Sequence, residues 1–114
     1  MKINSYSFGS ITINSKSYQK DIIVFPEKVR PNWIRTKGHS LELADLAEII
    51  DYNPETLIIG TGAYGSMTVP SSTKDALSRR KIKLIAEDTK KACTLFNENI
   101  KNNIKTVGAF HLTC

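Results

Sequence analysis

Cysteines are scarce in this sequence, and long apolar runs are missing. The 114 residues include two cysteines, Cys93 and Cys114, which are too few and too far apart for a disulfide framework. No run is long and apolar enough to span a membrane. The N-terminal residues have neither the apolar segment of a signal peptide nor the arginine-rich helix of a transit peptide. We therefore expect reduced thiols, a cytoplasmic location and no membrane partner.

Internal repeats and low-complexity tracts are also absent, and no linker divides the chain. A length of 114 residues is near the common size of one domain. An apolar share of 40% with 24% charged residues is too apolar for a disordered chain. The sequence thus predicts a single folded domain over residues 1–114.

Positive charge is in excess, but it is unevenly distributed. The formal net charge is +5, yet residues 41–70 contain five acids and no Lys or Arg. A nucleic-acid-binding protein concentrates its cations on one face, often with aromatic groups between them. The tightest cluster, Arg79, Arg80, Lys81 and Lys83, falls at the end of a predicted helix, where cations complement the helix dipole. We favour a solvated helix end over a phosphate-binding patch and expect no nucleic-acid partner.

The first 40 residues have the pattern of short strands. Runs rich in β-forming residues are separated by turn residues and predict an N-terminal meander; they lie at residues 6–8, 11–13 and 21–25. Pro26 and Pro31 interrupt regular pairing. We expect residues 28–39 to form an extended or looped stretch.

After residue 40, helices and strands alternate. Helical spacing of apolar residues predicts helices from residue 43 to about 53, at 72–80, and from Asp88 or Thr89 onward. Strands are expected at residues 56–60 and 82–86, with a final apolar run at 106–114. This order predicts an α/β fold with right-handed crossovers, in which a mixed sheet has helices on its faces and a smaller β layer beside it.

A glycine-rich segment follows the strand predicted at residues 56–60. Residues 60–65 read GTGAYG and match the GxGxxG spacing of dinucleotide-binding loops. Residues 66–70, however, have an extended rather than a helical pattern, and no acid follows on a second strand at the usual distance. Three interpretations stay open: a dinucleotide loop, a tight turn that needs positive φ angles, and a binding loop with exposed backbone N–H groups.

This loop, at the carboxyl end of a buried strand, is the best candidate for a functional surface. Trp33, the single tryptophan, lies in a proline-bounded basic stretch; we favour an anchor to the core over an exposed contact, and it remains a candidate for the same surface. The candidate ligand-binding or partner-binding residues are Gly60, Thr61, Gly62, Tyr64, Gly65, Met67 and Trp33.

No complete catalytic or metal-binding motif is present. We expect His111 to be a half-buried imidazole in a central strand with its hydrogen bonds satisfied, His39 to be exposed, and Cys93 to be a small core residue. Together with Cys114 these residues have the ligand types for zinc, but their spacing matches no recognised zinc motif. The sequence therefore predicts no cofactor, no metal and no catalytic residue.

Several blocks distributed over the chain resemble a known family. The blocks are FGSI at residues 8–11, Trp33 with His39 and Leu41, DL at 45–46, PETLIIGTG at 54–62, TKKAC at 89–93 with FN at 96–97, and GAFHLTC at 108–114. Together they resemble the small family that includes mitochondrial complex I assembly factor 3 and the adipogenesis-associated protein. The resemblance implies a three-layer β+α/β/α fold with a mixed central sheet, no established enzymatic activity, and action through protein partners.

Two functional hypotheses follow. The first is a non-enzymatic protein-interaction or assembly module with a protein partner, a second copy of the chain included, that uses the loop at residues 60–67 and Trp33. The second is a small-molecule or anion-binding protein or enzyme that uses the backbone N–H groups of the same loop. A concave pocket with converging polar groups at this loop would favour the second, and a filled surface the first.

Overall fold

A three-stranded antiparallel meander forms the N-terminal layer. The computed structural model describes all 114 residues, and the meander consists of β1 (Ile3–Ser7), β2 (Ser10–Ile13) and β3 (Lys16–Tyr18) in that spatial order. Alternation along β2 buries Ile11 and Ile13 and leaves Ser10 and Thr12 half-buried. The meander therefore has one apolar face, which packs on the rest of the domain.

The central sheet has five strands in the order β5-β4-β8-β6-β7. Its strands are β4 (Ile22–Val24), β5 (Val29–Arg30), β6 (Thr56–Thr61), β7 (Lys83–Glu87) and β8 (Thr106–His111). β6 is parallel to β7 and β8, whereas β4 is antiparallel to β8 and β5. The sheet is mixed, and the strand predicted at residues 56–60 lies within it with every residue buried.

The prediction was wrong about the third strand of the meander. Residues 21–25 do not join β1 and β2; their strand, β4, pairs with β8 in the central sheet. All three residues of β4 are buried because both of its faces are covered. The meander is completed instead by β3, whose largely exposed residues have no apolar alternation to reveal it.

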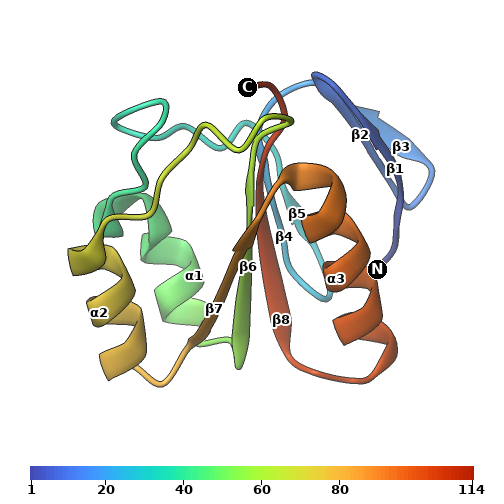
Figure 1. Ribbon diagram of the computed structural model, residues 1–114. Coiled ribbons are helices and arrows are strands. Elements are labelled where there is room, and N and C mark those ends of the chain that lie inside the picture. Colours follow the sequence, from blue (N-terminus) through green and yellow to red (C-terminus); the bar gives the residue numbers. More distant parts are fainter.

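Three layers result, as the resemblance implied (Figure 1). The short 3₁₀ helix η1 (Leu43–Leu46), α1 (Ala47–Tyr52) and α2 (Ser71–Arg79) cover one face of the central sheet. α3 (Thr89–Lys101), capped by Asp88, and the meander cover the other. None of these helices has the length and apolarity that crossing a membrane requires.

The carboxyl ends of the two central parallel strands meet at one edge of the sheet. Thr61 at the end of β6 lies opposite His111 at the end of β8. The Thr89 hydroxyl at the start of α3 donates to the His111 carbonyl over 2.6 Å and accepts from the Gly62 N–H over 2.9 Å. The glycine loop, the start of α3 and the segment after β8 are thereby held together at this edge.

Candidate functional site

The glycine loop is covered by the segment that follows β8. The Ala63 N–H donates to the Thr113 carbonyl over 2.7 Å, and the N–H groups of Tyr64 and Ser66 donate to the Cys114 main-chain oxygen over 3.3 and 3.1 Å. Those of Gly62, Gly65 and Met67 donate to Thr89, Gly62 and Thr61. Every backbone donor from residue 62 to residue 67 therefore has a protein partner, so an anion would find no free donor among them.

Close packing accounts for the glycines of the GxGxxG pattern. Gly62 has φ = +109°, and a Cβ there would come within 2.2 Å of the Cys114 carbonyl carbon. A Cβ on Gly60 would lie 2.9 Å from both the Phe110 ring and the Thr89 hydroxyl. The next helix, α2, begins only at Ser71, whereas a dinucleotide loop leads directly into its helix. The loop thus matches the tight-turn interpretation.

The candidate residues at the loop divide into a buried and an exposed group. Trp33 is 8% exposed, and its indole N–H donates to the Asp45 carbonyl over 3.1 Å, which is the anchor arrangement. Tyr64 and Gly65 are exposed. The buried group comprises Gly60, Thr61, Gly62, Met67 and Trp33. Of the large side chains in the set, Tyr64 is the one that is exposed.

A buried polar cluster lies beside the loop, and sequence reasoning did not identify it. The Asp21 carboxylate accepts a hydrogen bond from the Arg35 guanidinium over 2.8 Å, from His111 Nδ1 over 2.8 Å, and from the Leu112 N–H over 2.8 Å. The side chain of Arg35 is 5% exposed and that of Asp21 is 18% exposed. We call Asp21, Arg35 and His111 the polar cluster. It joins three segments that are distant in the sequence.

The electrostatics of the polar cluster favour an ionised Asp21. Burial by itself raises the pKa of Asp21, but the hydrogen bonds from His111, Leu112 and Arg35 outweigh it and bring that pKa below its ordinary value of 3.8. Since the carboxylate can only accept, His111 Nδ1 carries the hydrogen. Arg35 Nη2, 3.2 Å from the same nitrogen, instead donates to the Gly38 carbonyl over 2.9 Å. The ion pair holds the loop at residues 31–40 against the sheet.

Two nitrogens of the polar cluster have no partner. His111 Nε2 and Arg35 Nε are both buried without a hydrogen bond. His39, which is exposed as expected, places its ring 5.6 Å from that of His111 in an edge-on orientation. His111 is 6% exposed, more deeply buried than the half-buried position expected from the sequence. Its hydrogen bonds are also not all satisfied, contrary to the prediction, because Asp21 binds Nδ1 but nothing binds Nε2.

The other reactive residues lie apart. Burial raises the pKa of the Cys93 thiol to about 12, with a further contribution from Asp88, whereas Cys114 is exposed. Nowhere do three His, Cys, Asp or Glu side chains come close enough to hold a metal ion. The cysteines and histidines considered for zinc therefore do not converge.

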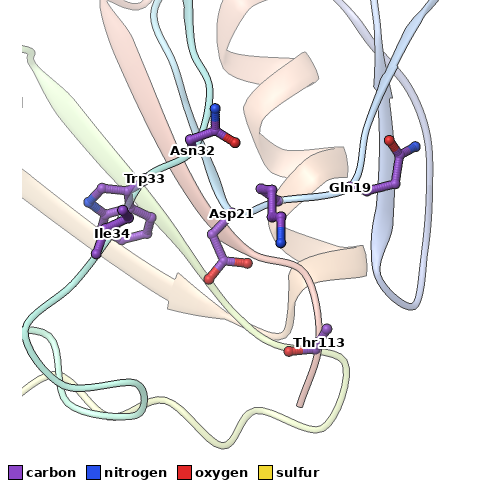
Figure 2. Close-up of a pocket in the computed structure, with 7 residues that line it drawn as sticks. Gln19, Asp21, Asn32, Trp33, Ile34 and Thr113 are labelled. Atoms are coloured by element: carbon purple, nitrogen blue, oxygen red, sulfur yellow. The ribbon is translucent and has the colours of Figure 1, made fainter.

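A groove opens above Asp21, with a volume of about 510 Å³. It is lined by residues 19–21 on one side, residues 32–34 on the other, and Thr113. Figure 2 shows Trp33 and Ile34 on one side of Asp21 and Gln19 on the other. Its size is in the range of ligand pockets, but its two walls are extended chain segments open to solvent.

Three large apolar side chains are exposed at the edge of the sheet where this groove lies, and one of them, Ile34, lines the groove. They are Phe8, 57% exposed; Ile34, 85% exposed; and Tyr64, 80% exposed. The Phe8 and Tyr64 rings lie 6.2 Å apart. Ile34 lines the groove together with Thr113, and the Thr113 carbonyl accepts a hydrogen bond from the N–H of Ala63, the residue before Tyr64. We call Phe8, Ile34 and Tyr64 the apolar rim. It combines the β1–β2 turn, the loop after β5 and the loop after β6.

Fold and site define a class of small three-layer α/β proteins. At the carboxyl edge of the mixed sheet lie a glycine loop whose backbone donors are engaged, a buried polar cluster and an apolar rim. The chain belongs to the family described as protein of unknown function (DUF498/DUF598), which matches residues 3–111.

Solved structures share this fold over nearly the whole chain. A conserved hypothetical protein PH1505 from Pyrococcus horikoshii is 24% identical with a TM-score of 0.84, and the match covers 100% of each chain. The Rpa2829 protein from Rhodopseudomonas palustris is 25% identical with a TM-score of 0.80, covering 95% of this chain and 80% of that one. A Bordetella pertussis protein described as a Mth938-like domain is 19% identical with a TM-score of 0.68, covering 97% and 85%.

Proposed function

We propose that this chain is a non-enzymatic protein-interaction or assembly module that binds a protein partner through the apolar rim and the groove beside it. The observation that carries the proposal is the position of its exposed large apolar side chains. Phe8, Ile34 and Tyr64 come from three separate segments and all border one end of the domain. Single exposed apolar residues are ordinary, but a group of them beside a groove is typical of an interaction surface.

The framework below the rim suits binding without a large loss of conformational entropy. The polar cluster fixes the start of β4, the loop at residues 31–40 and the end of β8 relative to one another. The segment after β8 fixes the loop that carries Tyr64. A surface already held in one conformation binds more tightly because fewer groups must be ordered on association. The resemblance to a family that contains an assembly factor supports the same function.

The second hypothesis receives less support from the geometry. It needed free backbone N–H groups in the glycine loop, and those of residues 62–67 are all engaged within the protein. Of the ionisable groups that line the groove, Asp21 is already bound to Arg35 and His111, and Lys20 is the one left without an ion-pair partner. The interaction hypothesis requires neither a free donor nor a reactive group.

Affinity capture from the native cell, with each recovered protein quantified, tests the proposal. The test variant is Phe8→Ser/Tyr64→Ser, and the matched control is Lys74→Ser/Lys101→Ser, which alters two exposed residues on α2 and α3. We expect at least one protein to be recovered equally by the wild type and the control and about tenfold less by the rim variant. Equal recovery by all three chains, or no protein recovered above an unrelated bait, would contradict the proposal.

A further inference from the structure

We infer that the groove receives an extended, acidic segment of the partner protein, with an apolar side chain of that segment seated beside Trp33 and Ile34. This inference rests on the proposed interaction function and names the kind of partner that the same surface fits. Its basis is the shape of the groove, the charge along it, and the chemistry at its apolar end.

A second hollow adjoins the groove and shares lining residues with it. This hollow of about 360 Å³ is lined by residues 16–20 and 31–32, and it shares Gln19, Lys20 and Asn32 with the first. The two hollows form one channel between residues 16–21 and 31–34. Both walls are largely extended, and an extended ligand chain matches such a channel better than a helix, which is about 10 Å wide.

One wall of the channel includes a strand at the edge of its sheet. β3 pairs with β2 on one side and has no strand on the other. An unpaired edge is a template on which an extended peptide can add a further strand through main-chain hydrogen bonds. Addition of a strand gives affinity that depends little on side chains, while hollows beside the strand select particular side chains.

The charge of the channel selects acidic ligands. Lys16 and Lys20 are exposed, and neither has a carboxylate within ion-pair distance, although Lys16 also lies over the Tyr18 ring. The single acid in the walls, Asp21, is already paired with Arg35. The channel therefore presents two unpaired cations and no unpaired anion, and charge complementarity of this kind steers partners and discriminates among them.

The apolar end of the channel favours a peptide over a nucleic acid. The Trp33 ring is 8% exposed, and the Arg35 guanidinium carbon lies 4.7 Å from its centroid. A base therefore has no free aromatic face at Trp33 on which to stack. The side chain of Ile34, in contrast, is 85% exposed at the mouth of the groove, where it can contact an aliphatic or aromatic side chain of a peptide.

A second copy of the chain fits less well. The acidic stretch of this sequence, residues 41–55, is largely helical, in η1 and α1. Glu42 is already paired with Lys37, and Glu48 with Lys28 and Arg30. Because this stretch is largely helical and two of its acids are already paired, an extended acidic segment of a different protein fits the channel better.

The test is a selection from a displayed library of random 12-residue peptides, with the immobilised wild-type chain as bait. Selected peptides are synthesised, and their dissociation constants are measured for three chains: the wild type, Lys16→Ser/Lys20→Ser, and the matched control Lys74→Ser/Lys101→Ser. Amide chemical shifts of the labelled wild type then locate the bound peptide. Sedimentation of each chain alone measures self-association.

We expect the selected peptides to be rich in Asp and Glu around at least one apolar residue. Their affinity should fall about tenfold in the Lys16→Ser/Lys20→Ser variant, remain within about twofold in the control, and weaken as salt is added. The shift changes should be concentrated at residues 16–21 and 31–34. A proline in the centre of a selected peptide should abolish binding, because it removes a main-chain donor.

Four results would overturn the inference: no selected peptide, neutral or basic peptides, affinities unaffected by loss of the two lysines, or shift changes elsewhere. Self-association that is lost in Lys16→Ser/Lys20→Ser would assign the channel to a second copy. Whichever of these results is obtained, the capture experiment with Phe8→Ser/Tyr64→Ser tests the proposed interaction function separately. A partner lost with the rim variant and retained with the lysine variant would sustain the interaction function and reject the acidic segment.

Discussion

Two loops meet at the same edge of the central sheet, and they differ in how much surface they leave open to a ligand or partner. The loop at residues 60–67 has the motif-like glycine spacing, yet its backbone donors are engaged and Gly62 lies against the segment after β8. The loop at residues 31–40 has no motif, yet it supplies Arg35 to the polar cluster and Ile34 to the apolar rim. A pattern in the sequence can thus mark a packing requirement, while the open surface lies on a neighbouring segment.

Removal of Asp21 should give the largest effect and would test how strongly the loop at residues 31–40 is held. The variant Asp21→Ala leaves the Arg35 charge buried without its partner, so we expect the free energy of unfolding to fall by about 3–5 kcal/mol. Asp75→Ala, which alters an exposed acid of α2 without an ion pair, should change it by less than about 0.5 kcal/mol. Urea unfolding followed by circular dichroism measures both, and similar losses in the two variants would show that the polar cluster does not hold this loop.

Substitution of Gly62 should also be strongly destabilising and would sharpen the structural interpretation of the glycine loop. Gly62→Ala forces a side chain into φ = +109° and against the Cys114 main chain. We expect a loss of about 2–4 kcal/mol in the free energy of unfolding. Gly38→Ala is the control, because a Cβ at Gly38 would have no atom within 4 Å and the residue has no positive φ; a change of about 0.5 kcal/mol or less is expected there. A well-tolerated Gly62→Ala would mean that the packing of the loop does not require this glycine.

Acid should weaken the polar cluster more than the glycine loop. The pKa of Asp21 is lowered from its ordinary value of 3.8, so its ionised form stabilises the folded state. This contribution is complete above the unfolded pKa and is lost as the pH falls through the lower folded pKa. We expect the free energy of unfolding to decrease below about pH 4, and to decrease less steeply in Asp21→Asn, which cannot ionise. Urea titrations between about pH 5 and about pH 2.5 give both slopes, and parallel slopes would exclude Asp21 as a source.

Tyr64 should give the smallest effect on stability. The variant Tyr64→Ser alters a side chain that is 80% exposed, so the free energy of unfolding should change by about 0.5 kcal/mol or less. Met67→Ala, in the same loop but 2% exposed, should cost about 2–5 kcal/mol. Thermal and urea unfolding compare the two variants. Equal losses would indicate that Tyr64 also belongs to the core and would weaken its assignment to the apolar rim.

Local patterns predicted most elements of the fold correctly. Continuous apolar residues identified β6, helical spacing identified the three regions that became α1, α2 and α3, and Asp88 was found at the start of α3. These features depend on neighbours within a few residues, so they are readable from the chain. β3 and β5 were not predicted, because their short and mostly exposed residues carry no periodic signal.

The site was predicted only in part, for a related reason. The sequence pointed to the carboxyl edge of the sheet as the candidate site, and Tyr64 is exposed at that edge. Asp21 and Arg35 were not singled out, because neither belongs to a motif and they meet His111 across separations of 90 and 76 residues. One signal was available in the sequence: Asp21 comes immediately before the uninterrupted apolar residues of β4. A charge at such a position needs a partner.

What the sequence by itself determined is therefore local: the order of most helices and strands, and the strand end at which a functional surface was sought. Periodicity, caps and turns decide these features within short segments. Only the tertiary structure decided that β4 belongs to the central sheet, that the glycines serve packing, and that Phe8, Ile34 and Tyr64 share one end. Each of these depends on contacts between residues far apart in the chain, and no pattern of neighbouring residues encodes which distant partner will be met.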